Sequence, residues 1–186
     1  MGEPLHNFDA LKSVLDILIS HDGFAFAHRK ITVSTVGLLP QMQELSAAYN
    51  VQIAISLHAP SNELRQQIVP MSRKFAVEEL VAFMRKFPRN QQTRFMVEYV
   101  LLQGVNNAES QAVALAQLLS GIRCQINLIP FNAAPGLNFR RPQDGGLENQ
   151  GFLNILRAAG LQSSLRRSRG QDILGACGQL SGVPAP

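Results

Sequence analysis

The segment ITVSTVGLLPQMQELSAAYNVQIAISLHAP, residues 31–60, decides the fold class because it contains a strand, a helix and a second strand in succession. Residues 31–36 are rich in β-branched side chains, which favour extended backbone. Gly37 and Pro40 then end this strand and open a helix. Residues 51–57 form the second apolar run. Two strands joined through a helix pair in parallel, with a right-handed crossover.

The same alternation continues on both sides of this segment. Apolar residues at helical spacing predict a first helix over residues 11–19. Further strands are predicted at 94–102, 124–131 and 162–167, and further helices at 62–68, 77–87, 106–119 (with Asn106 as its cap) and 152–159. This order predicts an α/β domain with a parallel sheet, either open or curved into a barrel, and with function at the carboxyl ends of its strands.

Composition limits the class of protein. The chain of 186 residues is 46% hydrophobic, which suits one domain with a sizeable core. It has no secretory leader and no apolar run near the ~18 residues that cross a bilayer, so we expect a cytoplasmic protein without a membrane partner. Its net charge is +4, with much of the excess late in the chain at Arg140, Arg141, Arg157, Arg166, Arg167 and Arg169. This charge permits a polyanionic partner, but a solvated basic face would have the same composition.

Polar side chains stand where three of the predicted strands end. They are Ser34-Thr35, Ser56-Leu57-His58 and Pro130-Phe131-Asn132. Because parallel strands share one carboxyl edge, these groups are expected to meet at one mouth, where they could hold a small polar cofactor. Each of them could instead only cap the helix that follows it.

The two cysteines have different surroundings. Cys177 lies in the tail segment RGQDILGACGQL, residues 169–180, whose small residues permit close approach to a cofactor. Nearby arginines could lower the pKa of its thiol and make it a nucleophile, although an inert buried cysteine is the alternative. Cys124 opens an apolar strand and is expected in the core. Two cysteines cannot form a Cys-x-x-Cys pair here or supply the three thiolates of an iron–sulfur cluster.

The beginning of the chain looks like a strand-to-helix junction without its strand. Residues 1–5 read MGEPL and precede the first predicted helix. We therefore expect the first helix to pack against a sheet edge that lacks one strand, as in a chain truncated at its N-terminus.

Five segments, taken in order, resemble the RlmN/Cfr family of radical S-adenosylmethionine RNA methyltransferases, on the RlmN side. They are MGEPLHN at the start, ITVSTVG, AISLHAP, NLIPFN and the tail RRSRGQDILGACGQL, and the resemblance runs from residue 1 to about residue 181. It implies an incomplete parallel (β/α)6 partial barrel of the radical S-adenosylmethionine type, whose first strand and N-terminal domain are missing. Residues 1–186 would then be the C-terminal part of the core domain, with 170–181 as its cysteine-bearing tail motif.

The resemblance also implies roles for individual residues. Gly2 and Glu3 match the pair that holds the amino group of S-adenosylmethionine, and further cofactor contacts fall on Ser34, Ser56, Leu57, His58 and Asn132. Cys177 matches the cysteine that takes a methyl group and carries it to C2 of an adenine in 23S rRNA, and in the RlmN branch also in some tRNAs. Adenine C2 is not nucleophilic, so the family uses radical chemistry that needs a reduced [4Fe-4S] cluster and an electron donor.

The chain departs from the family in two places. The family's Cys-x-x-x-Cys-x-x-Cys loop precedes the Gly-Glu pair, and no such loop stands before Gly2 here, so we expect no metal ligands in this chain. Ala133 replaces the usual proline after Asn132.

The implied function is therefore that of an RlmN-like enzyme of which this chain is a part. The chain would be inactive alone and could be completed by a separate N-terminal fragment, and the host compartment would be the cytoplasm or an organelle. The alternative is a non-catalytic remnant that binds RNA or S-adenosylmethionine weakly. A phosphate-binding barrel is disfavoured because no glycine-rich phosphate loop is present.

Overall fold

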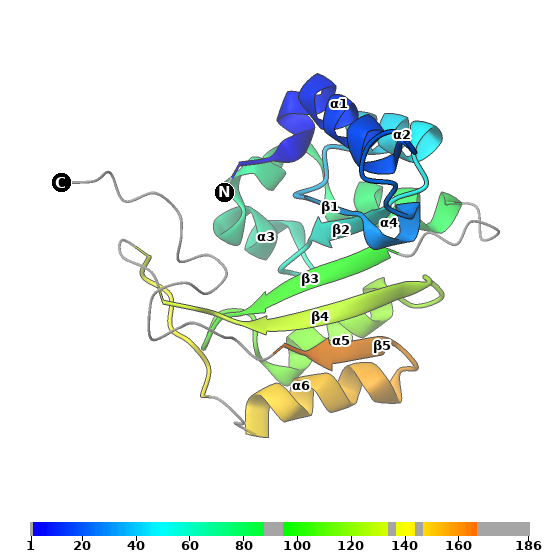
Figure 1. Cartoon of the computed structure of the whole chain (residues 1–186). Coiled ribbons are helices and arrows are strands. Elements are labelled where there is room, and N and C mark those ends of the chain that lie inside the picture. Colours follow the sequence, from blue (N-terminus) through cyan, green and yellow to red (C-terminus); the bar gives the residue numbers. More distant parts are fainter. Residues whose placement is uncertain (1, 88–94, 134–136, 144–146, 167–186) are drawn as a thin grey trace.

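The computed structural model describes residues 2–87, 95–133, 137–143 and 147–166. Its centre is a sheet of five parallel strands whose order in space follows the sequence (Figure 1). The strands are β1 (Thr32–Thr35), β2 (Gln52–Ser56), β3 (Phe95–Leu101), β4 (Cys124–Pro130) and β5 (Gln162–Leu165). The helices are α1 (Phe8–Ile19), α2 (Leu39–Ala48), α3 (Asn62–Ile68), α4 (Val77–Lys86), α5 (Glu109–Leu118) and α6 (Leu147–Ala158). The predicted α/β class is confirmed.

The sheet is open, because β1 and β5 do not pair with each other. Each strand adds to the one before it in the sequence, as in a parallel barrel that has not closed. Helices α1 and α2 lie beside β1, and α6 lies beside β5 (Figure 1). The described residues therefore form a partial barrel of the kind the resemblance implies.

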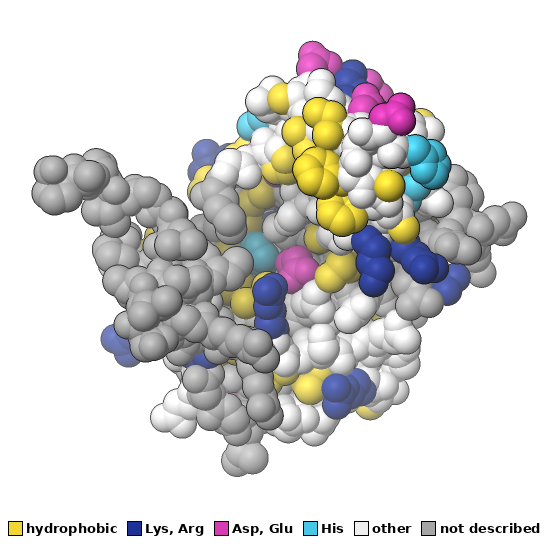
Figure 2. Space-filling view, viewed as in Figure 1, with side chains coloured by type: hydrophobic (Ala, Val, Ile, Leu, Met, Phe, Trp, Pro, Cys, Tyr) yellow, Lys and Arg dark blue, Asp and Glu magenta, His cyan; other side chains and the backbone are white. Residues whose placement is uncertain are grey.

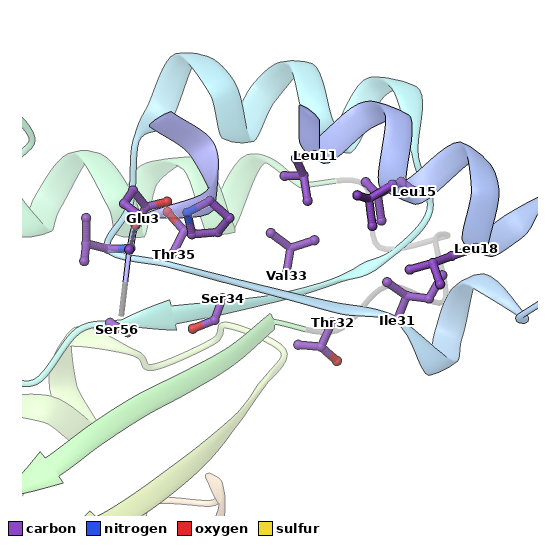
Figure 3. Close-up of a pocket in the computed structure, with 14 residues that line it drawn as sticks. Glu3, Leu11, Leu15, Leu18, Ile31, Thr32, Val33, Ser34, Thr35 and Ser56 are labelled. Atoms are coloured by element: carbon purple, nitrogen blue, oxygen red, sulfur yellow. Dashed lines mark hydrogen bonds between the residues drawn. The ribbon is translucent and has the colours of Figure 1, made fainter. Parts of the chain in front are cut away.

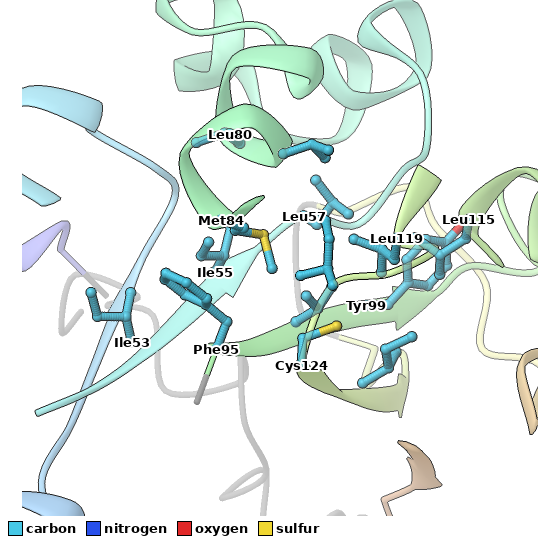
Figure 4. Close-up of a cluster of buried hydrophobic side chains, with 14 of the residues drawn as sticks. Ile53, Ile55, Leu57, Leu80, Met84, Phe95, Tyr99, Leu115, Leu119 and Cys124 are labelled. Atoms are coloured by element: carbon cyan, nitrogen blue, oxygen red, sulfur yellow. The ribbon is translucent and has the colours of Figure 1, made fainter. Parts of the chain in front are cut away.

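Alternation along the strands separates two faces of the sheet. In β3, Phe95, Val97, Tyr99 and Leu101 are buried and belong to the core, while the residues between them are only half-buried. Figure 4 shows Leu80 and Met84 of α4 and Leu115 of α5 directed at this buried face. The opposite face carries the half-buried residues Met96, Glu98 and Val100 of this strand.

Cys124 is a core residue, as its position in an apolar strand predicts. It opens β4, is 7% exposed and lies in the buried cluster of Figure 4. Burial raises the pKa of its thiol to about 11, so the thiol stays protonated at neutral pH. A buried, protonated thiol of this kind is a poor nucleophile and metal ligand.

The junction between β1 and α2 requires a glycine. Gly37 has φ +104°, in the region that favours glycine, and a Cβ atom there would lie 2.6 Å from Cδ2 of Leu80. The chain can therefore turn from β1 into α2 while α4 packs closely beneath the turn.

One sequence expectation about the elements is wrong. Asn106 does not cap the helix after β3: the N-cap of α5 is Ala108, and it makes no side-chain cap bond. Asn106 is instead fully buried, and its side chain bonds to the ends of β2 and β3. The side chain of Asn106 bonds the backbone carbonyl of His58, which is distant in sequence, instead of capping the helix.

Candidate cofactor site at the carboxyl ends of the strands

A row of polar side chains crosses the face of the sheet opposite the core. The strand register places Ser56, Glu98, Asn127 and Ser164 on four successive strands, each beside the next. The Ser164 hydroxyl donates to Asn127 Oδ1 (3.0 Å), and Asn127 Nδ2 donates to Glu98 Oε1 (3.0 Å). These bonds fix the carboxylate of Glu98 in the middle of the row.

The second oxygen of this carboxylate is buried without a partner. Among the described residues, no hydrogen-bond donor reaches Glu98 Oε2. A buried carboxylate oxygen without a donor is costly, so a donor from beyond the described residues, such as a bound ligand or water, would stabilise Glu98. Figure 2 shows a hollowed face with an acidic and a histidine side chain at its floor and basic side chains around it.

The beginning of the chain is tied to the end of β1 through Glu3. Its Oε1 accepts from the Leu5 N–H (3.0 Å) and its Oε2 from the Val36 N–H (2.8 Å). The carboxylate thus caps the first turn, Pro4–Asn7, and bridges to the strand. Each oxygen keeps a further acceptor position, so this arrangement leaves room for an ammonium partner.

Four of the residues expected to bind the cofactor line one cavity of about 580 Å³. Gly2 and Glu3 come from the start of the chain, Ser34 from β1 and Ser56 from β2 (Figure 3). The remaining wall is mostly apolar and comes from α1 and β1, including Leu11, Leu15, Leu18, Ile31 and Val33. Thr35, also a strand-end candidate, is buried and its hydroxyl accepts from the Gly37 N–H (3.0 Å), so its role is structural.

His58 follows β2 in an unusual backbone conformation. Its φ is +61°, a region that non-glycine residues rarely occupy. Its ring Nδ1 accepts from the Val100 N–H (3.1 Å), so in the neutral ring the proton is on Nε2. Burial of the ring, followed by the positive charge of Arg65, lowers the pKa of His58 to about 4, while the Glu98 carbonyl partly opposes them. The ring is neutral at pH 7.

Arg65 is a site residue that the sequence did not reveal. It lies on α3, is 1% exposed, and donates to the carbonyls of Val36 (2.5 Å), Leu57 (3.0 Å) and Ser56 (3.1 Å). Burial lowers its pKa to about 10, and it remains charged at neutral pH. An arginine on a seven-residue helix is ordinarily solvated, so no pattern marked it.

Asn132 follows β4 and is 6% exposed. Its Oδ1 accepts from Arg141 Nη1 (2.8 Å), which also bonds the Phe131 carbonyl (2.9 Å). Asn132 is thus held at the same sheet edge as the other candidates, two strands away from Ser56.

Cys177, with the whole 170–181 motif and with Arg167 and Arg169, lies outside the described residues.

The site suits a small, positively charged ligand better than a metal cluster. S-adenosylmethionine carries an ammonium, a sulfonium and ribose hydroxyls, and the open Glu98 oxygen and the spare Glu3 lone pairs fit such donors and charges. A [4Fe-4S] cluster does not fit: the described residues contain no group of three metal-ligating side chains, and the full sequence has two cysteines. No helix in the described part of the chain has the length and apolar character to cross a membrane.

Curated relatives match the chain along its whole length. It is 45% identical over 186 residues to "Dual-specificity RNA methyltransferase RlmN" of Anaeromyxobacter dehalogenans and 46% identical over 181 residues to "Dual-specificity RNA methyltransferase RlmN 2" of Myxococcus xanthus. The match covers 100% and 97% of this chain but only 50% and 47% of those proteins. The chain therefore spans about half the length of the curated relatives it matches. No protein-family model matches it.

Two solved structures are similar to this chain along most of its length. A radical SAM methyltransferase from Sphaerobacter thermophilus superposes with a TM-score of 0.90 and 42% identity, over 96% of this chain and 52% of that one. A domain of pyruvate-formate lyase-activating enzyme from Bacteroides vulgatus superposes with a TM-score of 0.66 at 20% identity, over 90% of this chain and 96% of that one, which shows a shared fold.

Proposed function

Because the chain belongs to the RlmN family of radical S-adenosylmethionine methyltransferases, we propose that it is part of an enzyme that methylates adenine C2 in 23S rRNA and tRNA. The names of the relatives, which describe dual-specificity RNA methyltransferases, support an RNA substrate, and the family resemblance of the sequence motifs suggests adenine C2 of 23S rRNA and tRNA. A net charge of +4 is compatible with a polyanionic substrate. Residues 1–186 would form the C-terminal part of the core domain.

The cofactor would be S-adenosylmethionine, held at the carboxyl ends of the strands. Gly2 and Glu3 would bind its amino group, and Ser34, Ser56, Leu57, His58 and Asn132 would make further contacts. The observation that supports this most directly is that three segments far apart in sequence line one cavity: Gly2-Glu3, Ser34 and Ser56. When bound, the cofactor supplies the methyl group.

Cys177 would carry that methyl group to the RNA. A thiolate is a strong nucleophile toward the methyl of a sulfonium: the new carbon–sulfur bond forms as the old one breaks, and S-adenosylhomocysteine leaves. The product is a methyl thioether on Cys177. Direct polar methylation of adenine C2 would fail because that carbon is not nucleophilic.

We assign no step to a [4Fe-4S] cluster, because the two cysteines of the sequence cannot supply its three thiolates. In the proposed enzyme the cluster ligands, the electron donor for the cluster and the N-terminal RNA-contacting region would come from outside residues 1–186. The chain alone would then be inactive. If it has no such partner, it would be a remnant that binds S-adenosylmethionine or RNA weakly.

A titration monitored by ¹H–¹⁵N NMR, which detects weak binding, tests the cofactor assignment. Millimolar S-adenosylmethionine should shift the amide signals of Val36 and Ser56, and Glu3→Gln should weaken binding because an ammonium loses its charged partner. Glu63→Gln, at an exposed site on α3, is the matched control. Equal affinities of the Glu3→Gln variant and the wild type would contradict the placement of the cofactor.

A further inference from the structure

The turn that follows β2 is held in a conformation it would not adopt alone. His58 has φ +61°, a conformation that is unfavourable for a residue with a side chain and persists only where its surroundings impose it. The N–H groups of Leu57 and His58 both point to the Glu98 carbonyl of β3, at 3.1 and 3.4 Å. The pairing of β2 with β3 ends at this point, and the next N–H of β3, that of Val100, donates to the His58 ring instead of to a backbone carbonyl. At this point a side-chain acceptor, the His58 ring, replaces the backbone acceptor of a neighbouring strand. Other contacts must hold the turn in this conformation.

Arg65 holds one flank of the turn. Its guanidinium donates to three carbonyls: those of Ser56 and Leu57 lead into the turn, and that of Val36 directly follows the neighbouring strand β1. Both salt bridges found among the described residues belong to Lys12, so the charge of Arg65 is offset by carbonyl oxygens. A planar group with several donors can span three acceptors, whereas a lysine ammonium concentrates its donors at one nitrogen.

Asn106 holds the other flank. It is 0% exposed, and its Nδ2 donates to the carbonyls of His58 (2.8 Å) and Val100 (2.6 Å). Its Oδ1 accepts from the Leu102 N–H (2.7 Å), and its own carbonyl accepts from the Tyr99 hydroxyl (2.8 Å). Both amide hydrogens of the side chain are therefore used to join the turn to the end of β3.

We propose that Arg65 and Asn106 are positioning residues that clamp the Ser56–His58 turn from its two sides in the conformation that binds the cofactor. This inference rests on the proposed function, because that turn carries three of the proposed cofactor contacts. Neither side chain acts on the cofactor itself. Each acts through the backbone: Arg65 ties the ends of β1 and β2 together, and Asn106 ties the end of β2 to β3.

A purely structural role would affect the whole fold, whereas a clamp affects the turn first. The Val100 amide reports on the turn because its acceptor is the His58 ring, and the Ile126 amide, at a fully buried position in β4, reports on the sheet. In Arg65→Lys, hydrogen exchange at Val100 should accelerate at least tenfold more than at Ile126. Arg85→Lys makes the same chemical change at an exposed guanidinium and should accelerate neither. Asn106→Ser is the second variant and should reproduce the pattern if Arg65→Lys folds poorly.

Cofactor binding decides the functional half of the proposal. S-adenosylmethionine should bind Arg65→Lys or Asn106→Ser at least tenfold more weakly than wild type, and Arg85→Lys should bind normally. Exchange that accelerates equally at Val100 and Ile126, or a loosened turn that still binds the cofactor with wild-type affinity, would overturn the proposal. Failure of the wild-type chain itself to bind S-adenosylmethionine would count against the proposed function, while the exchange pattern would still decide whether the two residues clamp the turn.

Discussion

Glu98 combines two properties that are rarely found together in one carboxylate. One oxygen is fixed by Asn127, which is itself held by Ser164, and the other is buried without a partner among the described residues. In the ligand-free protein this arrangement costs stability, because a buried charge is only half satisfied. A cationic or donor-bearing ligand that bonds Glu98 Oε2 would offset this cost.

We expect Glu98→Gln to separate stability from binding. The amide can still accept from Asn127, and it removes the poorly solvated charge, so the free energy of unfolding should stay the same or rise by about 1 kcal/mol. S-adenosylmethionine binding should weaken at the same time. Urea unfolding and an NMR titration measure the two effects, and a variant that is less stable but binds normally would contradict this role for Glu98.

His58 should make stability depend on pH in a predictable direction. Its pKa is about 4 in the folded chain and 6.5 when unperturbed, so between these values the unfolded chain binds a proton that the folded chain does not. Stability is therefore fully present above pH 6.5 and falls as the pH falls toward 4, by up to about 3 kcal/mol. In urea unfolding at pH 7 and pH 5, His58→Gln should show a smaller loss than wild type. His21→Gln, at an exposed position, should behave as wild type; identical pH slopes for all three proteins would contradict the assignment.

At the level of elements, the turn from β1 to α2 depends on the close packing of α4. Gly37→Ala introduces a Cβ atom 2.6 Å from Leu80 in addition to an unfavourable φ, whereas Gly121→Ala introduces the same kind of strain (φ +73°) with no atom within 4 Å. We expect Gly121→Ala to cost about 1 kcal/mol and Gly37→Ala at least about 1 kcal/mol more, because packing must shift. Thermal or urea unfolding of the pair measures the difference, and equal costs would show that Leu80 moves aside freely.

Local patterns in the sequence were sufficient to locate the strands and helices. The β-branched run before Gly37 and the apolar run before Ser56 became β1 and β2 because each is a buried parallel strand whose hydrophobic residues also favour extended backbone. The resemblance to a known family supplied the expectation of a partial barrel. The ends of several elements differ, because caps are decided by one or two hydrogen bonds, and three short 3-10 helices, Pro4–Asn7, His28–Lys30 and Pro70–Lys74, were not predicted.

The clamp around His58 could not be predicted in this way. Asn106 bonds the carbonyl of a residue 48 positions earlier, and Arg65 reaches Val36, 29 positions earlier. Such pairs exist only once the strand register is formed, and nothing in their local sequence distinguishes them from a helix cap and a solvated arginine. The convergence of Ser34 and Ser56, in contrast, was predictable, since the carboxyl ends of parallel strands share one edge.

At the level of the whole molecule, the chain has the residues of the proposed cofactor site but too few thiolates for a cluster. Cys124 is buried in the core, which leaves Cys177 as the only other cysteine of the sequence. Anaerobic reconstitution of the purified chain with iron and sulfide should therefore give no stable [4Fe-4S] absorption, because two cysteines cannot provide three ligands. Iron analysis that finds one cluster per chain would contradict this prediction.

The central claim is that this chain contributes the methyl-carrying cysteine of an RNA methyltransferase, and one measurement tests it most directly. The part of a relative that this chain does not match is supplied by co-expression of that relative's N-terminal half, and the Cys177 peptide and the target RNA are both analysed by mass spectrometry. We predict S-methylcysteine at Cys177 and C2-methyladenine in the RNA, loss of the methylated RNA in Cys177→Ala, and normal methylation in Cys124→Ala. Methylated RNA from the Cys177→Ala protein would contradict the account.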